Sequence, residues 1–443
     1  MAKQRSFNGG VHPSGFKEPT AGKAIVRVPL PQKVFIPLQQ HTGAPAKALV
    51  KKGDTVKTGK VIGEASGFIS LPVHASVSGK VVDVGLFPHP LFRQAEMVVI
   101  ESDGTDVWEE GIGEPVDIDN LSPAQMREAI SKAGVAGMGG AAFPTHVKLS
   151  PPEGKQIDTV ILNGAECEPY LTCDHRLMLE FPEKIVDGLK VILKILGCHS
   201  AHIAIEVNKP DAIARLKQSV DGSELISIIP LKVKYPQGAE KQLIHAITKR
   251  EVPSGGLPMD VGCVVQNVAT AFAISEAVSL NKPLIERVVA VTGPGVEEPQ
   301  NMWVRIGTPV RELIDQCGGY QSGVKKLVVG GPMMGVAQYT DEIPVIKGTS
   351  GILVLTAESS PSPPSQPCIS CGKCVESCPI GLMPNIIGKL VEHQRFSEAQ
   401  EYGILDCIEC GCCAYVCSAK INLIHLIKYA KQEIRLAGKE KGV

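Results

Sequence analysis

The chain has 443 residues, a formal net charge of −1 at pH 7, 44% apolar residues and 4% aromatic residues. Near-neutral charge argues against a nucleic-acid-binding protein, and no apolar run reaches the ~18 residues of a membrane-spanning helix. The start, MAKQRSFNGG, has no apolar signal core, so we expect a cytoplasmic protein with reduced thiols.

The first predicted domain, residues 1–110, is rich in short strands. Residues 33–100 alternate apolar stretches with Gly and Pro turns. The segments KALVKKGDTVKTGKVIGEASGF and PVHASVSGKVVDV resemble the β barrel-sandwich of biotinyl and lipoyl carriers. Such carriers hold a lysine at a hairpin tip, whereas the tip here, residues 64–68, reads EASGF. We therefore expect the fold without the swinging-arm chemistry.

The second predicted domain, residues 111–283, has an α/β pattern. A helix is expected to begin at Ser122-Pro123 and to end before Gly134, because serine, proline and glycine favour those positions. Over residues 157–280, apolar strands such as DTVILNG and AHIAIEV alternate with helical stretches such as NVATAFAISEAVSL. This alternation is typical of a parallel sheet with helices packed against it.

A glycine-rich loop, GVAGMGGAAFPTHVK, follows the first helix and ends at Lys148. Glycines let a backbone approach a ligand closely and direct N–H groups towards phosphate. The loop matches neither the Walker A motif nor the Rossmann fingerprint. On its residues alone, a structural turn explains the loop as well as a nucleotide site does.

A third, smaller β-rich unit is predicted over residues 284–345. Its expected strands are ERVVAVTGPGV and KKLVVGGPMMGV, which end in Gly/Pro turns. The segment ESSPSPPSQP then indicates an extended linker, placed at residues 346–367.

Eight cysteines near the C-terminus repeat one spacing twice, with two, two and three residues between neighbours. This spacing is typical of two [4Fe–4S] clusters, in which the fourth cysteine of each run ligates the other cluster. Zinc sites or disulfides are the alternatives, although zinc favours paired cysteines. The predicted ligands are Cys368, Cys371, Cys374 and Cys417 for the first cluster, and Cys407, Cys410, Cys413 and Cys378 for the second.

The segment between the two cysteine runs includes NIIGKLVEHQRF and has a helical pattern. We therefore expect an α-helical ferredoxin domain over residues 368–443. The remaining cysteines are expected to be buried thiols: Cys167, Cys173, Cys198, Cys263, Cys317 and Cys412.

Four segments carry a family resemblance. GVAGMGGAAFPTHVKL resembles the FMN loop of the NADH-binding flavoprotein subunit of respiratory complex I. NGAECEP, YPQGAE and VVQNVAT are similar to that family's later motifs and follow in the same order. Together with the opening GGVHP, the sandwich, the small β unit (β-grasp-like, of the SLBB type) and the clusters, they make the whole chain resemble the RnfC family. That family belongs to the Rnf complexes, which are ion-translocating ferredoxin:NAD⁺ oxidoreductases of the membrane.

This resemblance implies non-covalently bound FMN, with NAD(H) as substrate. Residues implied to line the flavin are Gly137, Gly139, Gly140, Ala141, Lys148 (at the phosphate), Asn163, Glu166, Tyr235, Gly238, Asn267 and Thr270. Residues implied to face the nicotinamide nucleotide are Phe143, Glu168 and Glu240. Two positions depart from the complex I pattern: Met138 replaces an arginine, and Ala165 replaces an aspartate.

The resemblance implies an enzyme component that passes electrons between NAD(H), FMN, two clusters and a partner. Hydride transfer needs no protein acid or base. Its implied partners are integral-membrane and ferredoxin-like subunits, with ferredoxin reached indirectly, at the cytoplasmic face of the membrane. The alternatives are a soluble cobalamin reductase with FMN and two clusters, and a cluster-carrying carrier or scaffold without flavin.

Overall fold

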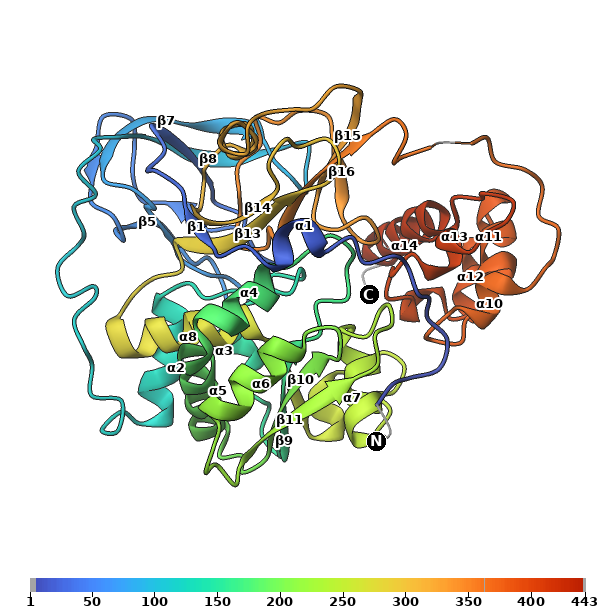
Figure 1. Cartoon of the computed structure of the whole chain (residues 1–443), viewed down its shortest axis with the longest axis horizontal. Helices are drawn as coiled ribbons and strands as arrows, with labels where there is room; N and C mark the ends of the chain where they lie inside the picture. The colour runs from blue at the N-terminus through green and yellow to red at the C-terminus, as the bar shows by residue number, and fades with distance from the viewer. Residues whose placement is uncertain (1–4, 362, 441–443) are drawn as a thin grey trace.

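The computed structural model describes residues 5–361 and 363–440. Residues 1–4, 362 and 441–443, which belong to the expected first domain, linker and last domain, lie outside the described residues. Figure 1 shows a β-rich region in blue and orange above a green and yellow α/β domain, with a red helical domain at one end.

The N-terminal sandwich consists of two small antiparallel sheets that enclose one core. Val34 and Ile36 on one strand face Val98 and Ile100 on its neighbour, and all four are fully buried. The first sheet has the order β2 (Lys33–Pro37), β8 (Gln94–Ser102), β7 (Gly79–Pro88), β4 (Thr55–Val56). The second has the order β3 (Lys47–Ala48), β5 (Val61–Glu64), β6 (Val73–His74). The barrel-sandwich prediction is confirmed.

The central domain contains a parallel sheet in the order β11 (Ile226–Leu231), β10 (Ala201–Glu206), β9 (Thr159–Gly164), β12 (Cys263–Asn267). Its helices are α2 (Pro123–Lys132), α3 (Thr145–Lys148), α4 (Cys173–Glu180), α5 (Pro182–Leu196), α6 (Pro210–Ser219), α7 (Glu240–Thr248), η1 (Pro258–Val261) and α8 (Val268–Leu280). The predicted start of α2 is confirmed, since Ser122 and Gln125 form a capping box.

The third unit is a sheet of six strands in the order β1, β14, β13, β17, β15, β16, with helix α9 (Val310–Gln316). The strands span β1 (Val26–Arg27), β13 (Glu286–Thr292), β14 (Gln300–Arg305), β15 (Val324–Val329), β16 (Val336–Gln338) and β17 (Gly351–Thr356). Strand β17 pairs with both β13 and β15, and most of it is buried. The linker expected from residue 346 therefore begins only after β17, because GILVLT is an apolar central strand.

The C-terminal domain is helical, as predicted. Its apolar core joins α11 and α12 to α14 through Ile387, Val391, Ala399 and Ile427. The elements are α10 (Lys373–Glu376), α11 (Pro384–Glu392), α12 (Phe396–Glu401), η2 (Ile404–Asp406), α13 (Cys412–Tyr415) and α14 (Leu423–Glu440). Among the described residues, no helix combines the length and the apolar character that crossing a membrane requires.

Residues 5–25, here called the N-terminal strap, run across three domains. Val11 pairs with Tyr235 of the central domain, and Gly10 N donates to Ser377 O of the cluster domain at 2.8 Å. The strap contains the short helix α1 (Glu18–Ala21) and leads into β1 of the six-stranded sheet. In Figure 1 it is the dark blue trace that connects the red domain to the centre of the molecule.

Candidate functional site

Three of the four motifs meet at one edge of the central sheet, and the glycine-rich loop lies over the same edge. Asn163 near the end of β9 and Asn267 at the end of β12 are paired in register. The segment 235–240 follows β11, and Gly238 O accepts a hydrogen bond of 2.8 Å from Asn163 Nδ2. Ligands of open parallel sheets bind outside the carboxyl ends of the strands, so this edge is the candidate site.

The glycine-rich loop is attached to the start of α8. Met138 N donates to Thr270 Oγ1 at 2.9 Å, and a Cβ placed at Gly139 would lie 3.4 Å from Asn267 Cβ. Gly139, Gly140 and Ala141 are exposed, and a Cβ at Gly140 would meet no atom within 4 Å. The loop therefore offers bare backbone to an open side, which fits the close approach that a flavin phosphate or ring requires.

The N-terminal sandwich supports this loop from outside the central domain. Thr42 Oγ1 donates to Ala141 O at 2.9 Å, and Thr42 N donates to Ala142 O at 3.1 Å. Leu71 of the sandwich is buried against Ala136 and Ala142. The carrier-like domain thus packs its tip side on the proposed flavin loop, which is consistent with its predicted role as a scaffold.

Glu166 caps a helix. Its carboxylate accepts hydrogen bonds from Asp174 N at 2.7 Å and His175 N at 3.2 Å, in the first turn of α4. Asp174 in turn accepts from Asn267 Nδ2 at 2.6 Å. Burial, followed by the neighbouring Glu166 carboxylate, raises the pKa of Asp174 to about 7. The sequence analysis missed Asp174, although its place in the first turn of a helix was a signal.

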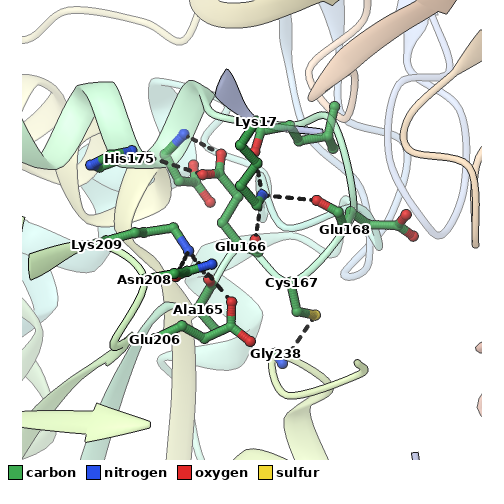
Figure 2. Close-up of polar contacts among 12 residues, drawn as sticks. Lys17, Ala165, Glu166, Cys167, Glu168, His175, Glu206, Asn208, Lys209 and Gly238 are labelled. Carbon is green, nitrogen blue, oxygen red and sulfur yellow. Dashed lines mark hydrogen bonds and ion pairs between the residues drawn. The ribbon is translucent and has the colours of Figure 1, made fainter. Parts of the chain in front are cut away.

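Two lysines hold the loop of residues 165–171 by its carbonyl oxygens (Figure 2). Lys17 of the strap donates to Glu166 O and Glu168 O, each at 2.9 Å. Lys209 is fully buried and donates to Ala165 O at 2.6 Å. Neither lysine was predicted as a site residue, because neither lies within one of the four motifs.

The carboxylate of Glu168 faces the small β unit. It accepts hydrogen bonds from Met333 N at 3.1 Å and Met334 N at 2.9 Å, in the turn between β15 and β16. Burial raises the pKa of Glu168 to about 7. The nucleotide contact implied for Glu168 would have to share a carboxylate that already joins two domains. The expected brace role of the β unit agrees with this contact.

Lys148 and Glu240, implied to contact FMN phosphate and nucleotide, form an ion pair with each other. Both side chains are partly exposed, so the pair lies where a ligand could reach it. Phe143 is half-buried on the same loop, and its carbonyl accepts from Gly137 N at 2.9 Å.

Tyr235 turns its hydroxyl towards the cluster domain. The side chain is 1% exposed, and the hydroxyl donates to Cys410 O at 2.8 Å. Around it, one apolar cluster joins the strap, the flavin motifs, the β unit and the second cysteine run. Its members are Val11, Tyr235, Cys410 and Cys412, with Cys167, Met333, Ile408 and Val416 packed against them.

The first predicted ligand set surrounds a cavity. Cys368, Cys371, Cys374 and Cys417 line a space of about 380 Å³ in the helical domain. Cys417 comes from the second run, so the crossed arrangement brings four sulfurs to one space. An iron–sulfur cluster held by four thiolates fits this donor set.

The second predicted ligand set is also gathered across the two runs. Burial, with the nearby Cys410 and Cys378, raises the pKa of Cys407 to about 11. Burial, with Cys407, Cys410 and Cys378, raises the pKa of Cys413 to about 12. Cys378 therefore lies among the cysteines of the second run, and coordination to a metal would deprotonate these thiols.

The six other cysteines largely follow the prediction. Five are buried, and only Cys167 is half-buried. The thiol of Cys412 faces the carbonyl oxygen of Tyr235 at 3.9 Å, away from the role of a ligand.

A glycine-rich α/β nucleotide site joined to a two-cluster domain defines a flavo-iron–sulfur electron-transfer protein. Family models agree domain by domain. They are the Nuo51 FMN-binding domain (130–276), the RnfC barrel sandwich hybrid domain (5–105), the SLBB domain (288–337) and the 4Fe-4S dicluster domain (363–418).

Curated relatives cover nearly the whole chain. The RnfC-type component of the proton-translocating ferredoxin:NAD(+) oxidoreductase complex of Clostridium ljungdahlii is 50% identical, over 99% of this chain and 96% of the relative. Its counterpart in the Na(+)-translocating complex of Acetobacterium woodii is 47% identical, over 99% of both chains. The counterpart in the ion-translocating oxidoreductase complex of Rhodobacter capsulatus is 41% identical, over 97% of this chain and 83% of the relative. This chain belongs to the RnfC family.

Among solved structures, an NAD⁺-reducing [NiFe]-hydrogenase in its H₂-reduced state matches with a TM-score of 0.51 and 17% identity. The match covers 74% of this chain and 68% of that chain. It supports the fold alone.

Proposed function

We propose that the chain is the NADH-oxidising subunit of an ion-translocating ferredoxin:NAD⁺ oxidoreductase, and that it conducts electrons between NAD(H) and partner subunits. FMN, when bound, accepts a hydride and releases electrons one at a time, which matches a two-electron donor to one-electron clusters. The exposed backbone at Gly139 and Gly140 is available to the flavin, with Lys148 near enough to the loop to serve its phosphate. Asn163, Gly238, Asn267 and Thr270 would line the opposite side.

The observation that carries this proposal is the shared apolar cluster around Tyr235. It places Cys167, next to the flavin motifs, in the same packed group as Cys410 of the second ligand set. The cavity of the first ligand set lies elsewhere in the helical domain. We therefore propose the order flavin, second cluster, first cluster, with the first cluster serving the partner.

The partners are proposed from the family. The relatives are named as subunits of ion-translocating complexes, and moving ions across a membrane requires integral-membrane subunits. We propose that the chain is held at the cytoplasmic face by integral-membrane and ferredoxin-like subunits, and that ferredoxin is reached through them.

The test uses the full chain purified without oxygen. We expect one FMN and about eight iron atoms per chain, and reduction of ferricyanide by NADH. Membranes from cells that lack the subunit should lose NAD-linked ferredoxin turnover, and the addition of purified protein should restore it. A chain that neither binds FMN nor oxidises NADH would contradict the proposal, as would ferredoxin reduction by the chain alone without an ion gradient.

A further inference from the structure

The N-terminal strap lies outside the FMN-binding domain of residues 130–276, but one of its side chains reaches into that domain. Lys17 Nζ donates to the carbonyl oxygens of Glu166 and Glu168, each at 2.9 Å, and of Leu171 at 2.5 Å. An ammonium has three protons, so its donor capacity is used on this single loop. Figure 2 shows the side chain directed at the loop between Glu166 and Glu168.

The loop needs such support because its backbone is strained. Glu166 has φ +47° and Tyr170 has φ +69°, a region that residues with a side chain rarely adopt. Conformations of this kind persist where the surrounding structure holds them in place. The carbonyl of Glu166 is one of the three oxygens bound by Lys17.

The second strained residue is held by the two strap residues before Lys17. Tyr170 N donates to Gly15 O at 2.7 Å. The Tyr170 ring stacks on Phe16, with ring centroids 4.8 Å apart and planes 16° from parallel. Residues 15–17 therefore contact both strained positions of the loop.

The shape of this loop decides how the flavin motifs meet. Glu166 points its carboxylate at the start of α4, where Asp174 in turn contacts Asn267 of the fourth motif. The Cys167 sulfur accepts a hydrogen bond of 3.3 Å from Gly238 N of the third motif. A change in the loop backbone would therefore disturb the second, third and fourth motifs together.

We propose that Lys17 is a positioning residue of the flavin site: through its ammonium, the strap holds residues 165–171 in the conformation that binds FMN. This inference rests on the proposed function, since it assumes that the loop lines the flavin. It assigns a role in cofactor binding to a residue that is about 150 positions away in sequence from the motif it serves. Its positive charge should also favour the reduced, anionic flavin.

The test compares Lys17→Met with Lys23→Met in the full chain carrying its clusters. Lys23 is the matched control, because it lies on the same strap and also donates to a backbone carbonyl, that of Pro299 in the β unit. For Lys17→Met we expect the FMN dissociation constant to rise roughly ten- to a hundred-fold, as for the loss of a charge-assisted hydrogen bond. Iron content should not change.

A second measurement separates positioning from general stability. With FMN in excess, the midpoint potential of the bound flavin should become more negative in Lys17→Met and stay at the wild-type value in Lys23→Met. Lys17→Gln, which keeps donors but loses the charge, should recover part of the FMN affinity. Unchanged FMN affinity and potential in Lys17→Met would overturn the proposal.

Loss of iron along with FMN in both Lys17 variants would also overturn it, because Lys17 would then be a residue of global folding. Failure of the proposed function has a different signature. In that case the wild-type chain itself would not bind FMN or oxidise NADH, and the comparison between Lys17 and Lys23 would show no difference to explain.

Discussion

The hydroxyl of Tyr235 donates a hydrogen bond of 2.8 Å to the carbonyl oxygen of Cys410. One residue belongs to the third flavin motif and the other to the second cysteine run. Gln242 adds a contact of the same kind, since its amide nitrogen donates to Pro379 O at 2.9 Å. The flavin edge and the second ligand set are therefore built against each other.

Removal of this hydroxyl should weaken the junction. Tyr235→Phe leaves the ring buried but removes the hydrogen bond, which should lower the free energy of unfolding by about 1 kcal/mol. We expect FMN content to be kept and NADH-driven cluster reduction to slow, as followed by stopped-flow spectroscopy. Tyr415→Phe, at an exposed tyrosine of the cluster domain, is the control. Wild-type rates in Tyr235→Phe would show that the contact has no part in electron transfer.

The crossed ligand sets predict a specific loss. Cys378→Ala should damage the cluster built on Cys407, Cys410 and Cys413, so that iron falls from about eight to about four atoms per chain. The signal that disappears from the electron paramagnetic resonance spectrum should be that of the second cluster. Cys412→Ala, a change at a buried thiol between two ligands, should keep the full iron content. Loss of the first cluster in Cys378→Ala would refute the crossed assignment.

The glycine-rich loop can be tested by adding side chains to it. Gly139→Val would press on Asn267, and Gly140→Val would place a β-branched residue at φ +107°, on the open side of the loop. Both variants should lose FMN while they retain iron, as measured by flavin absorbance and iron analysis. Gly22→Val is the control, since a Cβ there meets nothing within 4 Å and its φ of −84° is ordinary. Full flavin content in both loop variants would exclude this site.

Lys347 predicts a pH dependence of stability. Its ammonium is fully buried, contacts Gly134 O at 2.7 Å and Pro72 O at 3.3 Å, and has a pKa that burial lowers from 10.5 to about 7. Between these two values the unfolded chain binds the extra proton, so stability should rise as pH increases from about 7 towards 10.5.

Lys347→Met should flatten this rise, as measured by urea unfolding at pH 7 and pH 9. Lys80→Met, at an exposed lysine, should keep it. Equal slopes for wild type and Lys347→Met would show that the buried amine keeps an ordinary pKa.

Regular features of this chain could be predicted because they follow from local spacing. The cysteine runs carry their ligand chemistry in their intervals, and the period of the apolar residues over 157–280 distinguishes strands from helices. The motifs after β9, β11 and β12 also had to meet, because parallel strands present their carboxyl ends at one edge.

Other features depend on distant partners that leave no local pattern. The predicted linker includes GILVLT because the residues after it are rich in Pro and Ser, whereas its place between β13 and β15 rests on pairing with distant strands. Lys17 lies in a polar segment without periodicity, and its three acceptors are backbone oxygens, which no side-chain motif reveals. The orientation of Glu168 towards Met333 and Met334 likewise follows from domain packing.

The strap also has a consequence for biosynthesis. Gly10 pairs with Ser377, so one of the first segments to leave the ribosome waits for a partner 367 residues later in the chain. At the usual elongation rates this delay is about 20–70 s. During that time the central domain can fold, but the loop of residues 165–171 has only part of its final support from the strap. The last domain to be synthesised therefore completes the seating of the first segment, and cofactor insertion is best timed to the end of translation.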